Sequence, residues 1–313
     1  MSSSGMHRTF QVHLPADRTS ALVRDLNALD DVIGLALFTG DSEKPKGDML
    51  TIHLLNTGAD DVLRSIQHHC QGTRYLVTTA MNDSLVETSK TEQLENDVDE
   101  AIWEEMETGL RHHGRVSTNF VALMALGGVL ASIGLVSDPA PQAMAFVAAA
   151  VIAPGFEPLA KIALGTVLGQ WPVVKRGLWS SLVGYAVLIA AAALGFWIMQ
   201  QFGATSPDKF LQNPEVKSLS SPTAKEIMLS ICGTLAGALI VASFRKSVIA
   251  GALIAMVIIH AGAMIGVALV IGRPDLALEG AERFGLDIVL ILASCSLVFF
   301  LKQQFFHKRK PIV

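Results

Sequence analysis

The sequence predicts a chain in two parts: a soluble α+β domain with a ferredoxin-like plan, then an all-α membrane domain of six transmembrane helices arranged as a 3+3 inverted repeat. Three observations predict this fold class. Hydrophobic residues make up 51% of the chain and charged residues only 17%, a balance typical of a membrane protein. Residues up to Arg115 have the alternation of soluble protein, whereas from Val116 onward apolar runs long enough to cross a bilayer follow one another. The apolar part also contains a weak internal repeat.

Residues 1–90 are expected to form the ferredoxin-like domain. Phe10, Val12 and Leu14 alternate with polar residues, which is the period of a strand with one buried face. Apolar residues then recur at helical spacing up to Leu29. The same reasoning predicts strands at 32–38 and 49–55, a helix at 59–70 and a last strand at 75–79. The order β-α-β-β-α-β is that of a small antiparallel sheet with both helices on one face.

This plan also occurs in metallochaperones and RNA-binding proteins. A metallochaperone needs paired thiols in its first loop, but this loop reads Pro-Ala-Asp-Arg. An RNA binder needs exposed aromatic residues on the sheet and a basic surface, and the sequence shows neither. Cys70, Cys232 and Cys295 are far apart and outside any CxxC pattern. We therefore expect no cofactor, no metal site and no nucleic-acid partner.

Residues 91–115 are expected to form an acidic amphipathic linker helix. Its apolar stripe should pack on the soluble domain or on a neighbouring copy, so a homo-oligomer is expected. The stripe consists of Leu94, Val98, Ala101, Ile102, Met106 and Leu110. Basic residues follow directly before the first span, where such residues meet lipid head groups. They are Arg111, His112, His113 and Arg115.

Residues 116–313 contain six apolar runs of about the length that a spanning helix needs. The runs cover residues 116–136, 141–169, 177–202, 224–244, 247–271 and 284–301. The connections on one side are basic, with Lys175, Arg176, Arg245, Lys246 and a tail that contains Lys302, Lys308, Arg309 and Lys310. The connections on the other side are acidic. The positive-inside rule therefore predicts a multi-pass protein of the inner (plasma) membrane, in contact with membrane lipid, with both termini cytoplasmic.

The second apolar run carries residues that do not suit a continuous spanning helix. Pro154 and Pro158 each remove a backbone donor, so together they should break the helix into two halves. Glu157 is an ionisable side chain near the middle of the run, which costs about 2.5–3.5 kcal/mol on insertion scales and marks a functional site by default. Lys161 lies one turn later and is placed to pair with it.

The membrane part shows an internal repeat when the chain is shifted by 103 positions, with units at about 116–202 and 224–301. The matched positions are Ile162 with Ile265, Gly169 with Gly272 and Gly177 with Gly280, and the shift also places Glu157 on His260 and Gly184 on Asp287. Each unit holds three spans, an odd number, so the second unit must be inverted relative to the first. Inverted repeats with a broken central helix are the architecture of secondary transporters, whose sites lie near the midplane.

The segment 149–159, Ala-Ala-Val-Ile-Ala-Pro-Gly-Phe-Glu-Pro-Leu, resembles the proline-glycine-proline signature of a bacterial membrane family with an uncharacterised hydrophobic domain, domain of unknown function 389. The stretch 247–272 is similar to the second apolar block of that family, and the resemblance covers most of 116–301. The sequence departs from the family twice. Family members have a proline pair near His260 and Ala261, and an asparagine where Asp287 stands. The resemblance implies the membrane architecture and carries no activity with it.

Seven residues form the candidate site for a substrate or ion: Pro154, Gly155, Glu157, Pro158, Lys161, His260 and Asp287. Glu157 is either a proton- or ion-binding carboxylate or a structural partner of Lys161. His260 either carries a proton, as imidazole does near neutral pH, or hydrogen-bonds a backbone carbonyl. Asp287 is either a ligand or a surface or capping residue.

The function that these patterns favour is an integral membrane transporter or channel-like carrier for a small charged solute, with a cytoplasmic domain for regulation or oligomerisation. Lys161 and the free amides of the half-helix after Pro158 would attract an anion, while Glu157 or His260 exchanges a proton as access alternates. The alternative is a membrane-anchored sensor or scaffold with no transport activity. Enzyme activity is not expected, because the sequence has no HExxH, no GxSxG and a single deeply placed aspartate.

Overall fold

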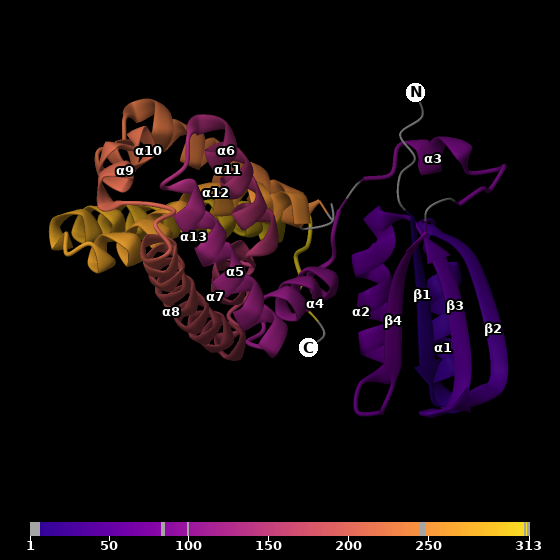
Figure 1. Ribbon diagram of the computed structural model, residues 1–313. Helices are drawn as coiled ribbons and strands as arrows, with labels where there is room; N and C mark the ends of the chain where they lie inside the picture. The colour runs from indigo at the N-terminus through magenta and orange to yellow at the C-terminus, as the bar shows by residue number, and fades with distance from the viewer. Residues whose placement is uncertain (1–6, 83–84, 99, 244–247, 310, 312–313) are drawn as a thin grey trace. The chain divides into compact units, whose positions relative to one another are not determined.

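The computed structural model describes residues 7–82, 85–98, 100–243, 248–309 and 311 (Figure 1). The chain divides into two compact units. The first, here called the sheet unit, comprises Met1–Glu105 with Arg309–Val313, and the second, the helical unit, comprises Met106–Lys308. The basic pair Arg245 and Lys246, the two predicted span ends beside it, and Lys310 lie outside the described residues.

The sheet unit is a four-stranded antiparallel sheet with two helices packed on one face. Its elements are β1 (His7–Leu14), α1 (Ala16–Asn27), β2 (Val32–Glu43), β3 (Lys46–Leu54), the 3-10 turn η1 (Asn56–Gly58), α2 (Ala59–Cys70) and β4 (Leu76–Asn82). The strand order is β2-β3-β1-β4, and every neighbouring pair is antiparallel. The alternating side chains of β1, among them Phe10 and Val12, meet Leu22 of α1 and Ile66 of α2 in one core. The alternation read from the sequence therefore predicts this sheet and its buried face correctly.

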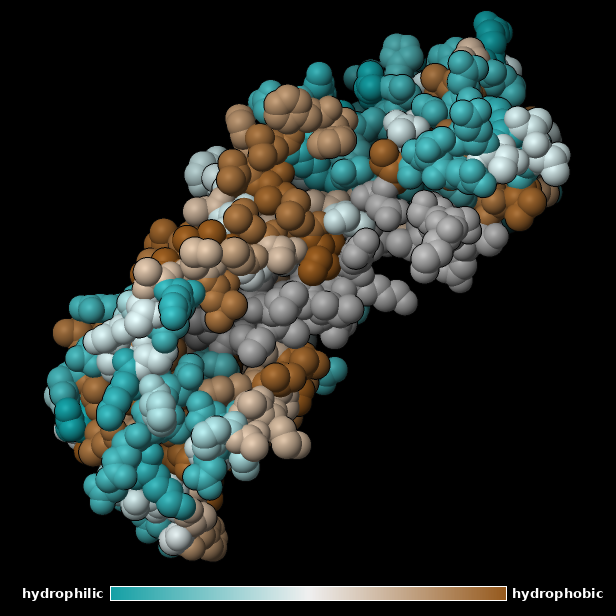
Figure 2. Space-filling view, turned by 90° about the horizontal axis from the view of Figure 1, so that it is seen from above, coloured by the Kyte–Doolittle hydropathy of each residue, from teal (hydrophilic) through white to brown (hydrophobic). Residues whose placement is uncertain are grey.

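The helical unit contains three helices long and apolar enough to cross a membrane. They are α8 (Trp171–Gln201), α11 (Ala224–Ala242) and α13 (Pro274–Phe305). Two bent pairs raise the number of candidate spans to five: α4 (Trp103–His113) with α5 (Thr118–Gly134), bent by 69°, and α6 (Pro139–Ile152) with α7 (Phe156–Val167), bent by 44°. The remaining elements are α9 (Pro207–Gln212), α10 (Pro214–Ser220) and α12 (Val248–Val270). Figure 2 shows brown apolar side chains gathered over the helices, as expected for a membrane protein.

Two long helices begin earlier than their apolar runs predict. Helix α8 starts at Trp171 rather than at residue 177, and α13 starts at Pro274 rather than at residue 284. A proline stands in the first turn of each, where its missing amide removes no helical hydrogen bond. Arg176 and Asp287 therefore belong to the helices themselves and not to the connections or the first turn. Hydropathy finds the lipid-facing part of a helix and misses its polar extension.

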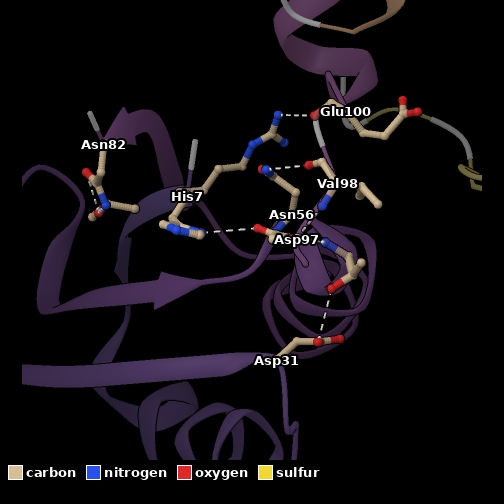
Figure 3. A network of polar contacts seen from close by, with 10 residues as sticks. His7, Asp31, Asn56, Asn82, Asp97, Val98 and Glu100 are labelled. Atoms are coloured by element: carbon tan, nitrogen blue, oxygen red, sulfur yellow. Dashed lines mark hydrogen bonds and ion pairs between the residues drawn. The ribbon is translucent and has the colours of Figure 1, made fainter. Parts of the chain in front are cut away.

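The predicted single linker helix is wrong. Residues 91–115 contain two helices, α3 (Thr91–Glu95) and α4, and residues 96–98 and 100–102 between them are not helical. The reason is the Asp97 carboxylate, which accepts hydrogen bonds from the backbone amides of Asn56 (2.8 Å) and Thr57 (3.4 Å) and lies 3.2 Å from Nδ1 of His7 (Figure 3). These interactions fix the segment on the sheet unit, where Ile102 of the predicted apolar stripe enters the core.

Buried ion pairs complete the sheet unit. The Arg8 guanidinium lies 3.0 Å from the Glu105 carboxylate, whose pKa is raised by burial against the opposing charge of Arg8. Arg309, near the carboxyl end of the chain, makes a bidentate ion pair with Glu104, with both distances 2.7 Å, and a further pair with Asp60. Arginine suits this position because its planar guanidinium offers two parallel donors to one carboxylate. The last residues of the chain are thus part of the domain that the first residues build.

Candidate functional site

The helix break lies at Pro154 and Gly155. Helix α6 ends at Ile152, and α7 begins at Phe156 after a bend of 44°. Pro154 stands inside the break, as the sequence predicts. Pro158, in contrast, lies in the first turn of α7, where proline is tolerated and breaks nothing. One proline makes the interruption, and the other stiffens the start of the half-helix that follows.

The break is held by its neighbours. The phenol of Tyr185 in α8 donates a hydrogen bond of 2.7 Å to the carbonyl of Gly155, and both groups are buried. Two close backbone approaches fix the start of α7. A side chain at Gly177 would meet the carbonyl oxygen of Pro158 at 2.9 Å, and one at Gly114 would meet the backbone of Glu157 at 3.3 Å. Tyr185 therefore supplies a hydrogen-bond donor to the interrupted backbone, which lipid could not supply.

Glu157 lies in the first turn of α7 and is 7% exposed. Its Oε2 atom has no hydrogen-bond partner among the described residues. Glu157 and Lys161 do not form the ion pair that their spacing predicts, although Lys161 is also buried, at 2% exposure. The charged groups that act on the Lys161 ammonium are Glu107, Arg111 and Arg176. The two charges of α7 thus face different surroundings.

Lys161 faces a cavity of about 890 Å³, here called the basic cavity. Its charged lining consists of Arg111 and Arg115 at the α4–α5 bend, Lys161 of α7 and Arg176 of α8. Pro154 of the break and the first residues of α5 also line it. Residues that the sequence assigned separately to a linker, a broken helix and a basic connection meet around one volume.

His260 belongs to α12 and is 4% exposed. Its ring stacks on Phe146 of α6 with a centroid distance of 3.6 Å. The Nε2 atom finds no hydrogen-bond partner in the part of the chain that the structure describes. The neighbouring residue Ile259 approaches Gly155 of the break, where it would be 3.7 Å from an added Cβ. His260 is therefore a buried, polar neighbour of the interrupted segment.

Asp287 is buried within α13, at 2% exposure, and lies 3.3 Å from the Nε atom of Arg283. Arg283 in turn donates a hydrogen bond of 2.7 Å to Ser230 of α11. The Arg283–Asp287 contact is an ion pair by distance, but neither carboxylate oxygen makes a well-directed hydrogen bond to a described residue. Asp287 is thus neither the surface residue nor the capping residue that its predicted position allowed.

His260 and Asp287 line a second cavity, of about 740 Å³, here called the acidic cavity. Its other charged residues are Glu215 of α10 and Glu226 of α11. The start of α5 lines the basic cavity, whereas Pro139 at the start of α6 lines the acidic cavity. Because α5 and α6 are joined by only a short connection, the start of α6 lies at the far end of α5. The two cavities therefore lie at opposite ends of this helix pair, and Pro154 of the break lines the basic cavity.

The segment that contains this site matches a known protein family. Residues 150–293 match the family described as Domain of unknown function (DUF389). This segment is similar to that family. It runs from the end of α6 into α13 and contains Glu157, His260 and Asp287, which confirms the family resemblance read from the sequence. Searches of curated proteins and of solved structures gave no match.

The DUF389 segment and its flanks include site residues that sequence reasoning missed. Tyr185 carried no signal, since a tyrosine in an apolar helix is common. Arg283 could have been found from its spacing to Asp287, which is that of an ion pair on one helix face. From the sequence, Arg176 indicates only the side of the membrane on which its connection lies. Among the described residues, no group of three His, Cys, Asp or Glu side chains could hold a metal ion.

Proposed function

We propose that this protein is an integral membrane transporter or channel-like carrier for a small charged solute, and that its sheet unit is a cytoplasmic regulatory or oligomerisation domain. The observation that carries the proposal is Glu157. Its carboxyl group is buried beside an interrupted helix, and one of its oxygens has no hydrogen-bond partner among the described residues. Pro154 of the same break lines the basic cavity. A buried carboxyl group of this kind is costly unless it binds something.

The proposed architecture has six spans in a 3+3 inverted repeat, and matched helix ends support it. Helix α7 ends at Val167 and α12 at Val270, and each is followed by a glycine with positive φ, Gly169 (68°) and Gly272 (71°). Both ends carry the same six-to-one hydrogen bond, of 2.7 Å after α7 and 2.9 Å after α12. Helices α8 and α13 then start at Trp171 and Pro274, again 103 positions apart.

Packing also follows the proposed repeat. Gly177 of α8 closes on Ile162 of α7, and Gly280 of α13 closes on Ile265 of α12. In each pair both residues are related by the same shift of 103 positions. Helix α7 packs on α8 and α13, and α12 packs on α13 and α8. The site thus combines the two elements that correspond in the repeat, one broken and one continuous.

The sheet order β2-β3-β1-β4 with two helices on one face supports a ferredoxin-like fold for the sheet unit. The proposed orientation, with both termini on the cytoplasmic side of the inner membrane, is supported by the basic residues Arg111, Arg115 and Arg176 around one cavity and by the inclusion of Arg309 in the amino-terminal unit. Oligomerisation through the sheet unit stays a prediction of the fold class.

In the proposed mechanism, Glu157 exchanges a proton or a cation as access alternates between the two cavities. Tyr185 and the close approach of Gly177 hold the half-helix in place while this occurs. His260, at the wall of the acidic cavity, is the second group that can carry a proton. Movement of the solute charge together with a proton would keep the buried carboxyl group from remaining ionised without a partner.

Proton movement in proteoliposomes tests this function. The full chain is reconstituted with a trapped pH-sensitive dye, and gradients of small ions, including inorganic phosphate and acetate, are imposed in turn. We expect at least one gradient to drive proton movement in the wild type and Glu157→Gln to abolish it. Glu282→Gln, which changes an exposed carboxylate of α13, is the matched control and should behave as the wild type. Unchanged proton movement in Glu157→Gln would refute the role of this residue.

The alternative function is a membrane-anchored sensor or scaffold without transport. The hydrogen bonds that join Asp97 and Val98 to Asn56 favour it, because a ligand on the sheet unit could act on the chain that enters the membrane. In that case Glu157→Gln and His260→Ala would leave the function intact, whereas disruption of the sheet core at Phe10 would abolish it.

A further inference from the structure

We propose that the basic cavity binds a phosphate-bearing anion, held by Arg111, Arg115, Lys161 and Arg176. The ligand is defined by the chemistry of the cavity: a compact group with at least one negative charge and several acceptor oxygens. A soluble phosphate compound and the head group of an anionic phospholipid both meet this description. The proposal does not depend on transport, because the site is a feature of the helical unit and its occupancy can be measured without a gradient.

The charge of the cavity is strongly unbalanced. Four cationic side chains line it, and the Glu107 carboxylate, 3.7 Å from Nε of Arg111, balances one of them. Arg111, Arg115 and Arg176 are exposed, so solvent screens their mutual repulsion, and a bound anion would lower that repulsion further. Two adjacent histidines, His112 and His113, also line the cavity and add donors to it.

Lys161 is the second, independent observation. Its side chain is 2% exposed and lines the cavity, and its ammonium has neither a hydrogen bond nor an ion pair to a described residue. An ammonium that is largely withdrawn from solvent is more stable with an anion beside it. Glu107 acts on it favourably, but Arg111 and Arg176 act against it. An anion in the cavity would attract Lys161, Arg111 and Arg176 and so offset the repulsion among them.

The start of helix α5 adds neutral donors to the same volume. Ser117, the N-cap residue of α5, and Asn119 line the cavity, and the hydroxyl of Ser117 accepts a hydrogen bond of 3.2 Å from the amide of Phe120. The amino-terminal end of a helix carries a partial positive charge and suits phosphate. Trp179, 61% exposed, also lines the cavity, a residue typical of the membrane interface. The site thus offers both charge and directed donors.

The basic cavity is in contact with the helix break. Gly114, between two of the cavity arginines in sequence, packs against the backbone of Glu157 and Pro158 at 3.3 Å. Pro154 of the break is itself part of the cavity wall. An anion that draws Arg111, Arg115 and Lys161 together would therefore press on the segment that carries Glu157. The cavity is placed to regulate that segment.

Binding is tested on the full chain purified in detergent. One arm measures equilibrium binding of radiolabelled inorganic phosphate, and the other uses native mass spectrometry to compare retained phosphatidylglycerol with phosphatidylcholine. Lys161→Met should lower the affinity for the probe by roughly tenfold, as expected for the loss of one charge-assisted contact. Arg176→Gln, which changes an exposed side chain of the cavity lining, should act in the same direction. Glu107→Gln should strengthen binding.

Lys175→Gln is the matched control, because Lys175 is the exposed neighbour of Arg176 and does not line the cavity. It should bind the probe as the wild type does. Selective retention of phosphatidylglycerol would identify the ligand as a lipid head group, and saturable phosphate binding would identify a soluble phosphate compound. The proposal is overturned if neither probe binds the wild type, or if Lys161→Met and Arg176→Gln bind as the wild type does.

Discussion

The sheet unit and helix α7 of the helical unit treat buried charge in opposite ways. In the sheet unit, Arg8 lies against Glu105, and Arg309 lies against both Glu104 and Asp60. In helix α7, Glu157 and Lys161 are 7% and 2% exposed, and neither forms an ion pair with a described residue, unlike the buried pair of Arg283 and Asp287 on α13. The first arrangement joins parts of the chain that are distant in sequence. The second is the arrangement we expect if, as proposed above, the groups serve a bound proton, ion or anion.

The effect of a substitution on stability can therefore distinguish structural charges from charges kept for binding. Removing one partner of a buried ion pair strands the other charge, so it costs about 3–5 kcal/mol. Neutralising a buried charge that has no partner should cost little, or even stabilise the fold. The predictions that follow use stability to test which charges are structural, and they run from the largest expected effect to the smallest.

Arg309→Ala should destabilise the sheet unit by about 3–5 kcal/mol, because it removes a buried cation that pairs with both Glu104 and Asp60. Hydrogen exchange of the full chain should show faster exchange of the amides in residues 7–82. The control is Arg18→Ala, whose partner Asp17 is exposed and whose ion pair should contribute less than about 1 kcal/mol. Equal protection in Arg309→Ala and Arg18→Ala would show that the carboxyl-terminal pair is not structural.

Gly177→Ala should destabilise the helical unit by about 1–3 kcal/mol, because the added Cβ would lie 2.9 Å from the carbonyl oxygen of Pro158 and push α8 away from the broken helix. Gly109→Ala is the control, since nothing lies within 4 Å of its added Cβ and alanine favours the helix by up to about 1 kcal/mol. Thermal unfolding in detergent measures both. A Gly177→Ala protein as stable as Gly109→Ala would mean that α7 and α8 are not in close contact.

Tyr185→Phe should cost about 1 kcal/mol, the usual net value of a buried hydrogen bond, because the carbonyl of Gly155 loses its donor. The loss should appear at the helix break and not across the whole unit. Hydrogen exchange of residues 153–159, compared with that of α11, makes this distinction. Unchanged exchange at the break would show that Tyr185 does not hold it.

The smallest effect concerns Cys70, whose thiol pKa is raised by burial from 9.0 to about 11, against the nearby charge of Arg18. Because the folded chain favours the neutral thiol, its contribution to stability is complete below pH 9 and is lost as the pH rises towards 11. Alkylation of Cys70 should therefore be slow at neutral pH in the folded chain. A Cys70→Ser variant with the same loss of stability over this pH range would contradict the assignment.

Much of the fold follows from local patterns. The alternation of Phe10, Val12 and Leu14 predicts a strand with one buried face, and that face is the core of the sheet unit. Pro154 predicts the helix break, because proline forbids helical hydrogen bonding whatever surrounds it. Such features depend on residues that are close together in the chain, so they can be predicted from the sequence.

Interactions between distant residues could not be predicted in the same way. Asp97 interrupts the expected linker helix because its acceptors meet donors from Asn56 and His7, far away in the chain. Lys161 is spaced to meet Glu157, but a helical spacing shows only that two residues share a face and not which way a long side chain turns. The convergence of Lys161 and Arg176 on one cavity depends on how helices pack, which no single segment reveals.

The most direct test measures stability and proton movement on the same preparation of Glu157→Gln. If Glu157 is a buried group kept for binding, the variant should unfold at the same temperature as the wild type or higher, and its ion-driven proton movement in proteoliposomes should be lost. A variant that unfolds more easily by more than about 1 kcal/mol while it still moves protons would contradict this account, because Glu157 would then be a structural residue like those of the sheet unit.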